Sequence, residues 1–324
     1  VRAEDTALGR MTEQEFDLVA LAVPMIPPTG LGELANKILV PIGEDGFIQE
    51  KHPKLDPVNS LMTGIFACGC ALGPKDIRDT VSDALGAAAK ASSFLSTGYV
   101  TASPEKPVVE SALCDGCGFC VKVCPYNAVT WTDKRVEINP YICMGCGACV
   151  PECPRDAIDF KNSTEEQLFA QMRGVLADKG PEEYRILAFV DQTIAYAGAD
   201  FLGLYRTEYP TEIRIIKVPS TAILSLKHLL YAFAAGADGI AIIEGQHDID
   251  ERFMKQRIQK FMPSLEDHGI ESVRIWYSLV MLPAYKKMAG IFSELAFMIQ
   301  DLGPVSEETR SAIKQKLNLS PAET

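Results

Sequence analysis

From Tyr184 onward, short apolar runs rich in Ile and Val alternate with longer stretches that have helical spacing. A short apolar run is typical of a strand buried on both faces, and strands that alternate with helices form parallel sheets. The pattern therefore predicts a small doubly wound parallel α/β domain over residues 184–303. The predicted strands are Ile186–Val190, Ile213–Val218, Gly239–Glu244 and Val273–Ser278, and the predicted helices are Ile194–Tyr205, Ala222–Ala235, Ile249–His268 and Pro283–Leu302.

Residues 1–100 have a different pattern, which predicts strands and turns that end in a helix. The apolar run Phe16–Val23 predicts a strand, Glu44-Asp45-Gly46 a turn, and Gly64–Gly69 a short buried strand that ends in glycine. Little before Phe16 could start a domain, so we expect this domain to be completed upstream or by another subunit. Thr80–Phe94 predicts a helix with Ala, Gly and Ser along one side, where a second backbone or a flat ligand can approach closely.

Two connecting segments complete the pattern. Residues 163–183 predict a linker helix over Ser163–Lys179, with Ser163 as its N-cap and acidic residues near its positive end. Residues 304–324 predict a polar tail with one amphipathic helical stretch, Glu307–Leu317, which wraps a neighbour or frays.

Between these regions, residues 101–162 hold eight of the ten cysteines, in two runs with one spacing, C-x-x-C-x-x-C-x-x-x-C-P. This spacing is typical of proteins that bind two [4Fe–4S] clusters, in which the fourth cysteine of each run ligates the other cluster. It predicts an α+β ferredoxin module. One cluster is expected at Cys114, Cys117, Cys120 and Cys153, and the other at Cys143, Cys146, Cys149 and Cys124.

The residues around the cysteines support a paired module. Gly116, Gly145 and Gly147 let backbone N–H groups turn toward sulfur, which helps to set the reduction potential. Residues 128–138 predict a hairpin that turns at Thr132-Asp133-Lys134. The alternatives are disulfides, which need an oxidising compartment, and structural zinc, which seldom uses this spacing.

Composition narrows the class of protein. The chain has 324 residues, enough for two or three domains, and its apolar content of 47% is that of a globular protein. No apolar run is long enough to cross a bilayer. Cysteines that bind iron–sulfur clusters imply a reducing environment, so we expect the protein in the cytoplasm. A net charge of -12 argues against binding to nucleic acid or an anionic membrane. That charge suits cationic redox partners, or solubility alone.

The first 160 residues resemble the flavoprotein A subunit of heterodisulfide reductase. The resemblance is carried by DxVxLAxxMxP (Asp17 to Pro27), EDGFxxExHPKLxPV (Glu44 to Val58) and the GPKDIxxxVxxAxxAAxKA helix entry (Gly73 to Ala91), followed directly by the two cysteine runs. The first segment is also similar to the C-terminal half of the FAD domain of thioredoxin-reductase-like flavoproteins.

The resemblance implies half of a flavin site, because the Gly-rich dinucleotide fingerprint of a complete FAD domain is missing. The implied flavin-binding residues are Gly69, Cys70, Pro74, Lys75 and Asp76, with backbone groups from Ile77 to Val81. Cys70 stands where the ordinary reductases have aspartate. Lys75 either stabilises anionic reduced flavin or is a solvated loop lysine. The Cys68 and Cys70 thiols are expected to be small buried side chains rather than ligands.

Residues 184–303 resemble the delta subunit of methyl-viologen-reducing hydrogenase, a [2Fe–2S] protein. The shared stretches are AYAGAD from Ala195, YPxxIRIIxVP from Tyr209, AFxxGADGI from Ala232 and GxH from Gly245. The cysteines of that family fall at positions occupied here by Asp191, Ile194, Ser220, Gln246 and Glu251. His247 alone cannot hold a cluster, so the resemblance implies a docking domain without a redox centre.

Together the resemblances imply an electron-transfer subunit of a heterodisulfide-reductase-like oxidoreductase complex, of the kind that serves methanogenesis. Two [4Fe–4S] clusters would relay single electrons between ferredoxin, or another carrier, and FAD shared with an upstream flavoprotein subunit. In that family the flavin can split or merge electron pairs. The alternatives are a component of an NAD(P)H-linked flavin oxidoreductase, a ferredoxin-like carrier with adaptor domains, and a structural scaffold.

Overall fold

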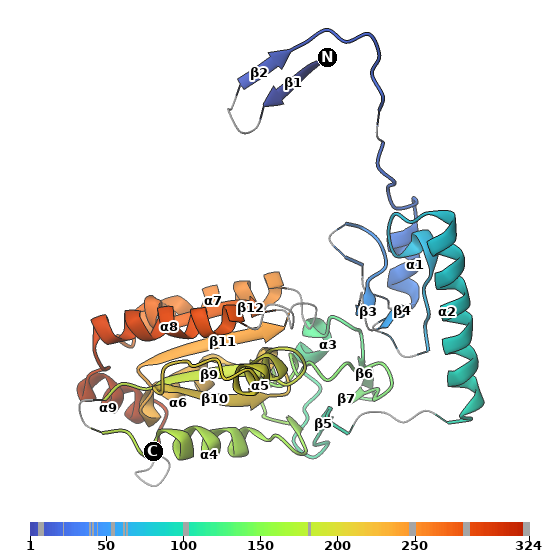
Figure 1. Ribbon diagram of the computed structural model, residues 1–324. Helices are drawn as coiled ribbons and strands as arrows, with labels where there is room; N and C mark the ends of the chain where they lie inside the picture. The colour runs from blue at the N-terminus through green and yellow to red at the C-terminus, as the bar shows by residue number, and fades with distance from the viewer. Residues whose placement is uncertain are drawn as a thin grey trace. The chain divides into compact units, whose positions relative to one another are not determined.

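The protein forms two compact units, residues 1–99 and 100–324, which are described separately (Figure 1). The computed structural model describes residues 1–5, 10–21, 23–38, 40, 42–43, 45–52, 56–60, 62, 64–99, 104–180, 183–245, 251–280 and 286–319. Within these ranges, no helix combines the length and the apolar character needed to cross a membrane.

In its described residues, the first unit forms two antiparallel strand pairs and two α-helices. Its helix α2 packs on strand β4, and Asp76 caps α2 by accepting a hydrogen bond from the Asp79 N–H at 2.7 Å. The expected helix over Thr80–Phe94 is thus confirmed and is longer at both ends. The elements are β1 (Arg2–Asp5) paired with β2 (Arg10–Glu13), α1 (Leu31–Ile38), β3 (Glu50–His52) paired with β4 (Asp56–Ser60), the 3₁₀ turn η1 (Gly69–Ala71), and α2 (Ile77–Ser96).

Two predicted strands of the first unit are wrong. The described residues of Phe16–Val23 form no strand, and their apolar side chains are exposed. A β-rich run becomes a strand only when a neighbouring strand shares its hydrogen bonds, and no described strand pairs with this run. In Gly64–Gly69 only Phe66 forms a bridge, with Asn59, before η1 begins. Glu44 of the predicted turn lies outside the described residues.

The second unit begins with the cysteine-rich module. Its hairpin is confirmed, because Asp133 and Lys134 both take positive φ at a two-residue turn between β6 and β7. An antiparallel pair that the sequence did not indicate, β5 with β8, joins the beginning and the end of the module. The elements are β5 (Pro107–Val109), α3 (Phe119–Val123), β6 (Val129–Thr132), β7 (Arg135–Ile138) and β8 (Ile158–Phe160).

The rest of the second unit is a four-stranded parallel sheet in the order β10-β9-β11-β12 (Figure 1). This order is doubly wound, since the chain adds β10 on one side of β9 and then returns to the other side. The predicted strands and helices are confirmed where the structure describes them, with small shifts at their ends, except that the predicted helix Ala222–Ala235 begins with a separate 3₁₀ turn. Residues 249–250 and 283–285 of two predicted helices lie outside the described residues. The elements are β9 (Ile186–Asp191), α5 (Ala195–Leu204), β10 (Ile213–Val218), the turn η2 (Thr221–Ile223), α6 (Leu226–Ala235), β11 (Gly239–Gly245), α7 (Glu251–Glu266), the turn η3 (Ser272–Arg274), β12 (Ile275–Val280) and α8 (Lys286–Leu302).

The sheet is buried on both faces, as its unbroken apolar runs require. Alternate residues of β9 point to opposite sides. Ile186, Ala188 and Val190 pack with α5 and α8, whereas Leu187 and Phe189 pack with α6 and α7. The two hydrophobic cores therefore lie on opposite faces of one central sheet.

The two segments expected to be a linker and a tail are parts of this domain. Helix α4 (Glu165–Leu176) packs on α6, and its N-cap is Thr164, not the predicted Ser163. Thr164 and Gln167 form a complete capping box, which Ser163 is one residue too early to make. Helix α9 (Glu307–Lys316) also packs on α6 and buries Arg310 and Ile313 completely or nearly so.

Asp238, which is fully buried, ties these segments together. Its carboxylate accepts hydrogen bonds from Lys179 Nζ at 2.6 Å and Arg310 Nη2 at 2.5 Å. It also accepts from the N–H groups of Arg185 and Val305, both at 2.9 Å. One acid thus joins the end of the α4 segment, the start of the sheet and the α9 segment.

Candidate metal centres

The two cysteine runs exchange their last members in the fold. One pocket, called pocket I, is lined by Cys114, Cys117 and Cys120 of the first run and by Cys153 of the second. The other, pocket II, is lined by Cys143, Cys146 and Cys149 of the second run and by Cys124 of the first. The structure thus brings together each set of four thiols that the spacing groups together, although 33 and 19 positions separate the exchanged cysteine from the nearest member of its set.

The two runs have equivalent backbones where the exchanged cysteines lie. Asn127 and Asp156, each three residues after one of these cysteines, both adopt a φ of 49°. The next residue then turns its N–H back toward sulfur: Ala128 N lies 3.3 Å from Cys124 Sγ, and Ala157 N lies 3.3 Å from Cys153 Sγ. Of the three glycines expected to make such bonds, Gly145 does so, to Cys143 Sγ at 3.4 Å.

Close packing requires glycine at several positions of the cysteine runs, among them the equivalent pair Gly118 and Gly147. Each follows the second cysteine of its run and has positive φ, 77° and 70°. A Cβ on Gly118 would lie 2.0 Å from the Trp131 ring, and one on Gly147 would lie 2.4 Å from Ile223. Sequence reasoning missed Gly118, although the repeated Cys-Gly pair was the available signal.

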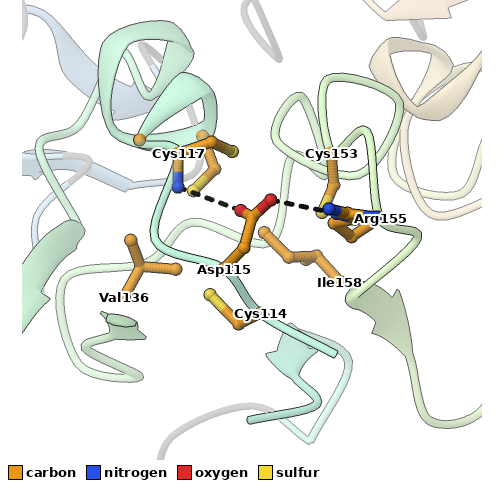
Figure 2. A pocket seen from close by; sticks show the side chains of 9 residues that line it. Cys114, Asp115, Cys117, Val136, Cys153, Arg155 and Ile158 are labelled. Atoms are coloured by element: carbon orange, nitrogen blue, oxygen red, sulfur yellow. Dashed lines mark hydrogen bonds and ion pairs between the residues drawn. The ribbon is translucent and has the colours of Figure 1, made fainter. Parts of the chain in front are cut away.

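Pocket I lies near the protein surface. Its ligand candidate Cys117 is exposed. Asp115 spans the pocket mouth, accepting from Cys117 N at 3.1 Å and from Arg155 Nε at 3.0 Å (Figure 2). The hydrogen bond from Arg155 holds the pKa of the Asp115 carboxyl below its ordinary value. This ion pair joins the two runs across the pocket.

The thiols of pocket II are less accessible. Burial raises the pKa of Cys146 to about 12, and it also raises those of Cys143 and Cys149. In pocket I burial raises the pKa of Cys120 to about 11. Iron binding must therefore displace protons from these thiols.

The donor set fits four-iron clusters. Each pocket offers four thiols, backbone N–H groups aimed at sulfur, and an apolar surround that includes Val136 and Ile158 or Val129 and Ile138. In the described part of the chain, no group of three or more His, Cys, Asp or Glu side chains is arranged to hold a single metal ion. A four-iron cluster requires a different arrangement of thiols from a single metal ion. Its four thiolates bind four separate iron atoms, so they lie farther apart than four ligands around one ion.

Pocket II lies against the α/β domain. Ala148, between two of its cysteines, packs with Ala222 and Met254 of that domain, and Cys146 contacts the same cluster. Arg257 of α7 reaches across: it donates to Ala222 O at 2.5 Å, Ala148 O at 3.3 Å and Glu152 Oε1 at 2.7 Å. A cavity of about 400 Å³ follows this seam, bordered by Glu152, Arg257 and His228 among others.

The residues expected to bind flavin lie together in the first unit. Gly69 has a φ of 61°, and its N–H donates to Asp83 Oδ2 at 3.2 Å. Lys75 forms an ion pair with the same carboxylate and is partly buried, so it is not a free loop lysine. Cys70 is exposed and Cys68 is partly buried, rather than both being buried as expected. Pro74 and Asp76 lead into α2, and Ile77 and Val81 of its first turns are exposed.

At the C-terminal edge of the parallel sheet, where such domains bind ligands, the described ends of β9 and β11 are bonded and packed to each other. The buried carboxylate of Asp191 accepts from the N–H groups of Thr193, Ile194 and Ala195, at 2.8 to 3.0 Å, and from Gly245 N at 2.6 Å. Ile194 packs so closely on Gly245 that a Cβ there would lie 2.3 Å away. Ser220 caps η2 through Ala222 N at 3.2 Å. Gln246 and His247 lie outside the described residues.

Known protein families and relatives match parts of this chain. Residues 113–157 match the 4Fe-4S dicluster domain family, and residues 186–303 match the family of the methyl-viologen-reducing hydrogenase delta subunit. The chain is 36% identical over 299 residues to the A subunit of the ferredoxin:CoB-CoM heterodisulfide reductase of Methanosarcina acetivorans, covering 91% of this chain and 37% of that protein.

Two further relatives show the same relationship. The protein of that name from Methanosarcina mazei is 32% identical over 318 residues, 96% of this chain and 40% of the relative. The A subunit of the H(2):CoB-CoM heterodisulfide,ferredoxin reductase of Methanothermobacter thermautotrophicus is 45% identical over 179 residues, 55% of this chain and 27% of the relative. The chain spans less than half the length of these relatives. It is thus a homologue of the heterodisulfide reductase A subunit, with a 4Fe–4S dicluster domain followed by a domain of the hydrogenase delta-subunit family.

Proposed function

We propose that the chain is an electron-transfer subunit of a heterodisulfide-reductase-type oxidoreductase complex. Two [4Fe–4S] clusters would carry single electrons between FAD, shared with a partner polypeptide, and ferredoxin or another carrier. The observation that carries this proposal is the grouping of eight cysteines around two pockets, each completed by the other run. Cys114, Cys117, Cys120 and Cys153 would hold cluster I, and Cys143, Cys146, Cys149 and Cys124 would hold cluster II.

The different surroundings of the two pockets support a relay. The exposed Cys117 would bring cluster I near the surface, where a mobile carrier can approach, whereas pocket II packs against the α/β domain. The N–H groups of Ala128, Gly145 and Ala157 would stabilise the negative charge on sulfur in both oxidation states. When bound, the clusters supply one-electron chemistry, and the protein contributes the ligands, their spacing and their electrostatic surroundings.

The proposal places half of a flavin site in residues 1–99. It is supported by the resemblance at Gly69 to Val81 and by the α2 N-terminus, whose positive dipole end suits an anionic group. Lys75 would act from an ion pair with Asp83, which fixes its position beside Gly69.

A partner that completes the FAD domain would cover apolar surface on this unit. Exposed apolar residues lie on α2 and in residues 16–26, before α1, and exposed apolar surface of this kind can serve as an interaction site. They include Ile77, Val81, Leu85 and Leu95 on α2, and Phe16, Leu18, Leu21, Val23 and Ile26 before it.

We also propose that the α/β domain carries no cluster of its own and serves as a docking domain. The motive is that Asp191, Ile194 and Ser220 replace cysteines of the related family and are engaged in internal packing and hydrogen bonds. Asp191 is committed to at least four backbone N–H groups, so this position offers a hydrogen-bonded carboxylate in place of a thiolate.

Anaerobic reconstitution of the chain with iron and sulfide tests the proposal. We expect about eight iron and eight sulfide per chain, with EPR signals of two interacting [4Fe–4S] clusters after reduction. Tight flavin binding is expected only after a partner flavoprotein is added. About ten iron with a [2Fe–2S] signal would contradict the docking role, and bound zinc or intramolecular disulfides would contradict the electron relay.

A further inference from the structure

Arg257 is the one buried cation, among the described residues, that the α/β domain inserts beside pocket II. Its side chain is only 7% exposed, and its guanidinium contacts both sides of the seam. Ala148, whose carbonyl it binds, lies two residues after Cys146 and directly before Cys149. A charge in this position acts on the second cysteine loop through a medium that screens it poorly.

The partner of Arg257 belongs to the cysteine-rich module. Glu152 Oε1 accepts from Arg257 Nη2 at 2.7 Å, and its side chain is 42% exposed. The acid is thus more strongly screened by solvent than the guanidinium, so the pair leaves a net positive field at pocket II. Lys106 is a second cation near Cys143, but it comes from the module itself.

We propose that the α/β domain tunes cluster II through Arg257, which acts as a positioning residue and as a source of positive charge. Reduction adds an electron to the cluster, so nearby positive charge stabilises the reduced form and raises the reduction potential. A domain without a redox centre would thereby set how easily its neighbour accepts an electron. This inference rests on the proposed assignment of the ligands of cluster II.

The test uses the reconstituted full chain and an EPR-monitored redox titration. Arg257→Gln removes positive charge and leaves Glu152 unpaired, so the cluster II potential should fall. Glu152→Gln removes a negative charge from the same seam, so the same potential should rise. At a fixed solution potential, each change should alter the ratio of reduced to oxidised cluster II by about tenfold, which is about 59 mV for one electron.

Potential shifts of opposite sign in Arg257→Gln and Glu152→Gln distinguish an electrostatic role from a structural one. If the variants only loosened the seam, both would shift the cluster II potential in the same direction. Arg257→Lys keeps the charge and should lie closer to the wild-type potential than Arg257→Gln does. The cluster I potential should change less in every variant. A Cys146→Ser variant identifies which EPR signal belongs to cluster II.

Unchanged potentials, or shifts of the same sign in both charge variants, overturn the inference while leaving the two-cluster relay intact. If Arg257→Gln fails to assemble cluster II, the Glu152→Gln variant alone provides the test. A cluster II potential that does not rise in that variant overturns the inference. Wild-type protein without a second four-iron cluster overturns the proposed function itself, and this inference with it.

Discussion

Asn127 and Asp156 adopt the same left-handed backbone conformation at equivalent places of the two cysteine runs, each with a φ of 49°. Asn and Asp tolerate this region better than other residues with a Cβ. The turn that each makes directs the next N–H toward the exchanged cysteine.

Replacing Asn127 tests this backbone requirement. Asn127→Ala should lower the free energy of unfolding by about 1 kcal/mol, because alanine strains the left-handed conformation. Asn127→Gly should be close to neutral or mildly stabilising, since glycine adopts it readily. Urea unfolding followed by loss of the cluster absorbance gives the comparison, and equal stability of the two variants would refute the strain argument.

Cys124 belongs to the first run but lines the pocket of the second. Cys124→Ala should therefore remove cluster II, so that iron falls from about eight to about four per chain, and loosen the neighbouring loop. Cys70→Ala, at an exposed cysteine of the first unit, is the matched control and should leave the iron content unchanged. Iron near eight in Cys124→Ala would show that the ligands are assigned wrongly.

His228 should make stability depend on pH. Burial lowers its pKa to about 3, and the adjacent Lys227 adds to this effect. The Glu165 carboxylate lies 3.6 Å from Nε2 and would favour the cation, but it is already paired with Lys227, so burial decides the direction.

The folded pKa of His228 lies below the unfolded value, so the unfolded chain takes up the proton first as pH falls. The stability linked to His228 is complete above about pH 6.5 and is lost from there down to about pH 3, by about 1.4 kcal/mol per pH unit. Gln at this position keeps the capping box with Ser225, as Gln167 does with Thr164 in α4. Denaturant unfolding of wild type and His228→Gln at pH 7.5 and 5.5 should show a smaller acid loss in the variant, and parallel losses would contradict the prediction.

Asp238 should be one of the most sensitive positions of the α/β domain. Asp238→Ala leaves the buried cations Lys179 and Arg310 without their common carboxylate, which should cost about 3 to 5 kcal/mol of unfolding free energy. Asp301→Ala removes an exposed carboxylate of α8 and should change stability by no more than about 0.5 kcal/mol. Denaturant unfolding followed by circular dichroism measures both, and similar small losses would argue against the buried network.

Periodicity alone predicted the parallel sheet, because its strands are buried on both faces and their apolar runs are uninterrupted. It missed the hairpin of β1 and β2, whose strands RAED and RMTE each hold a single apolar residue. It also failed for Phe16–Val23, whose composition suits a strand although its described residues form none. The fourth member of each ligand set followed from a known spacing. No local pattern indicates that Arg257 reaches Glu152, 105 positions earlier, or that Asp238 collects Lys179 and Arg310.

The exchange of the last cysteines also bears on biosynthesis. With the proposed ligands, a ribosome delivers every thiol of cluster II once Cys149 has emerged, while cluster I still waits for Cys153. Cluster II, which takes three of its four ligands from the second run, is thus the first to have all of its ligands synthesised. A nascent chain halted between these two positions would have all four ligands of cluster II but only three of the four ligands of cluster I.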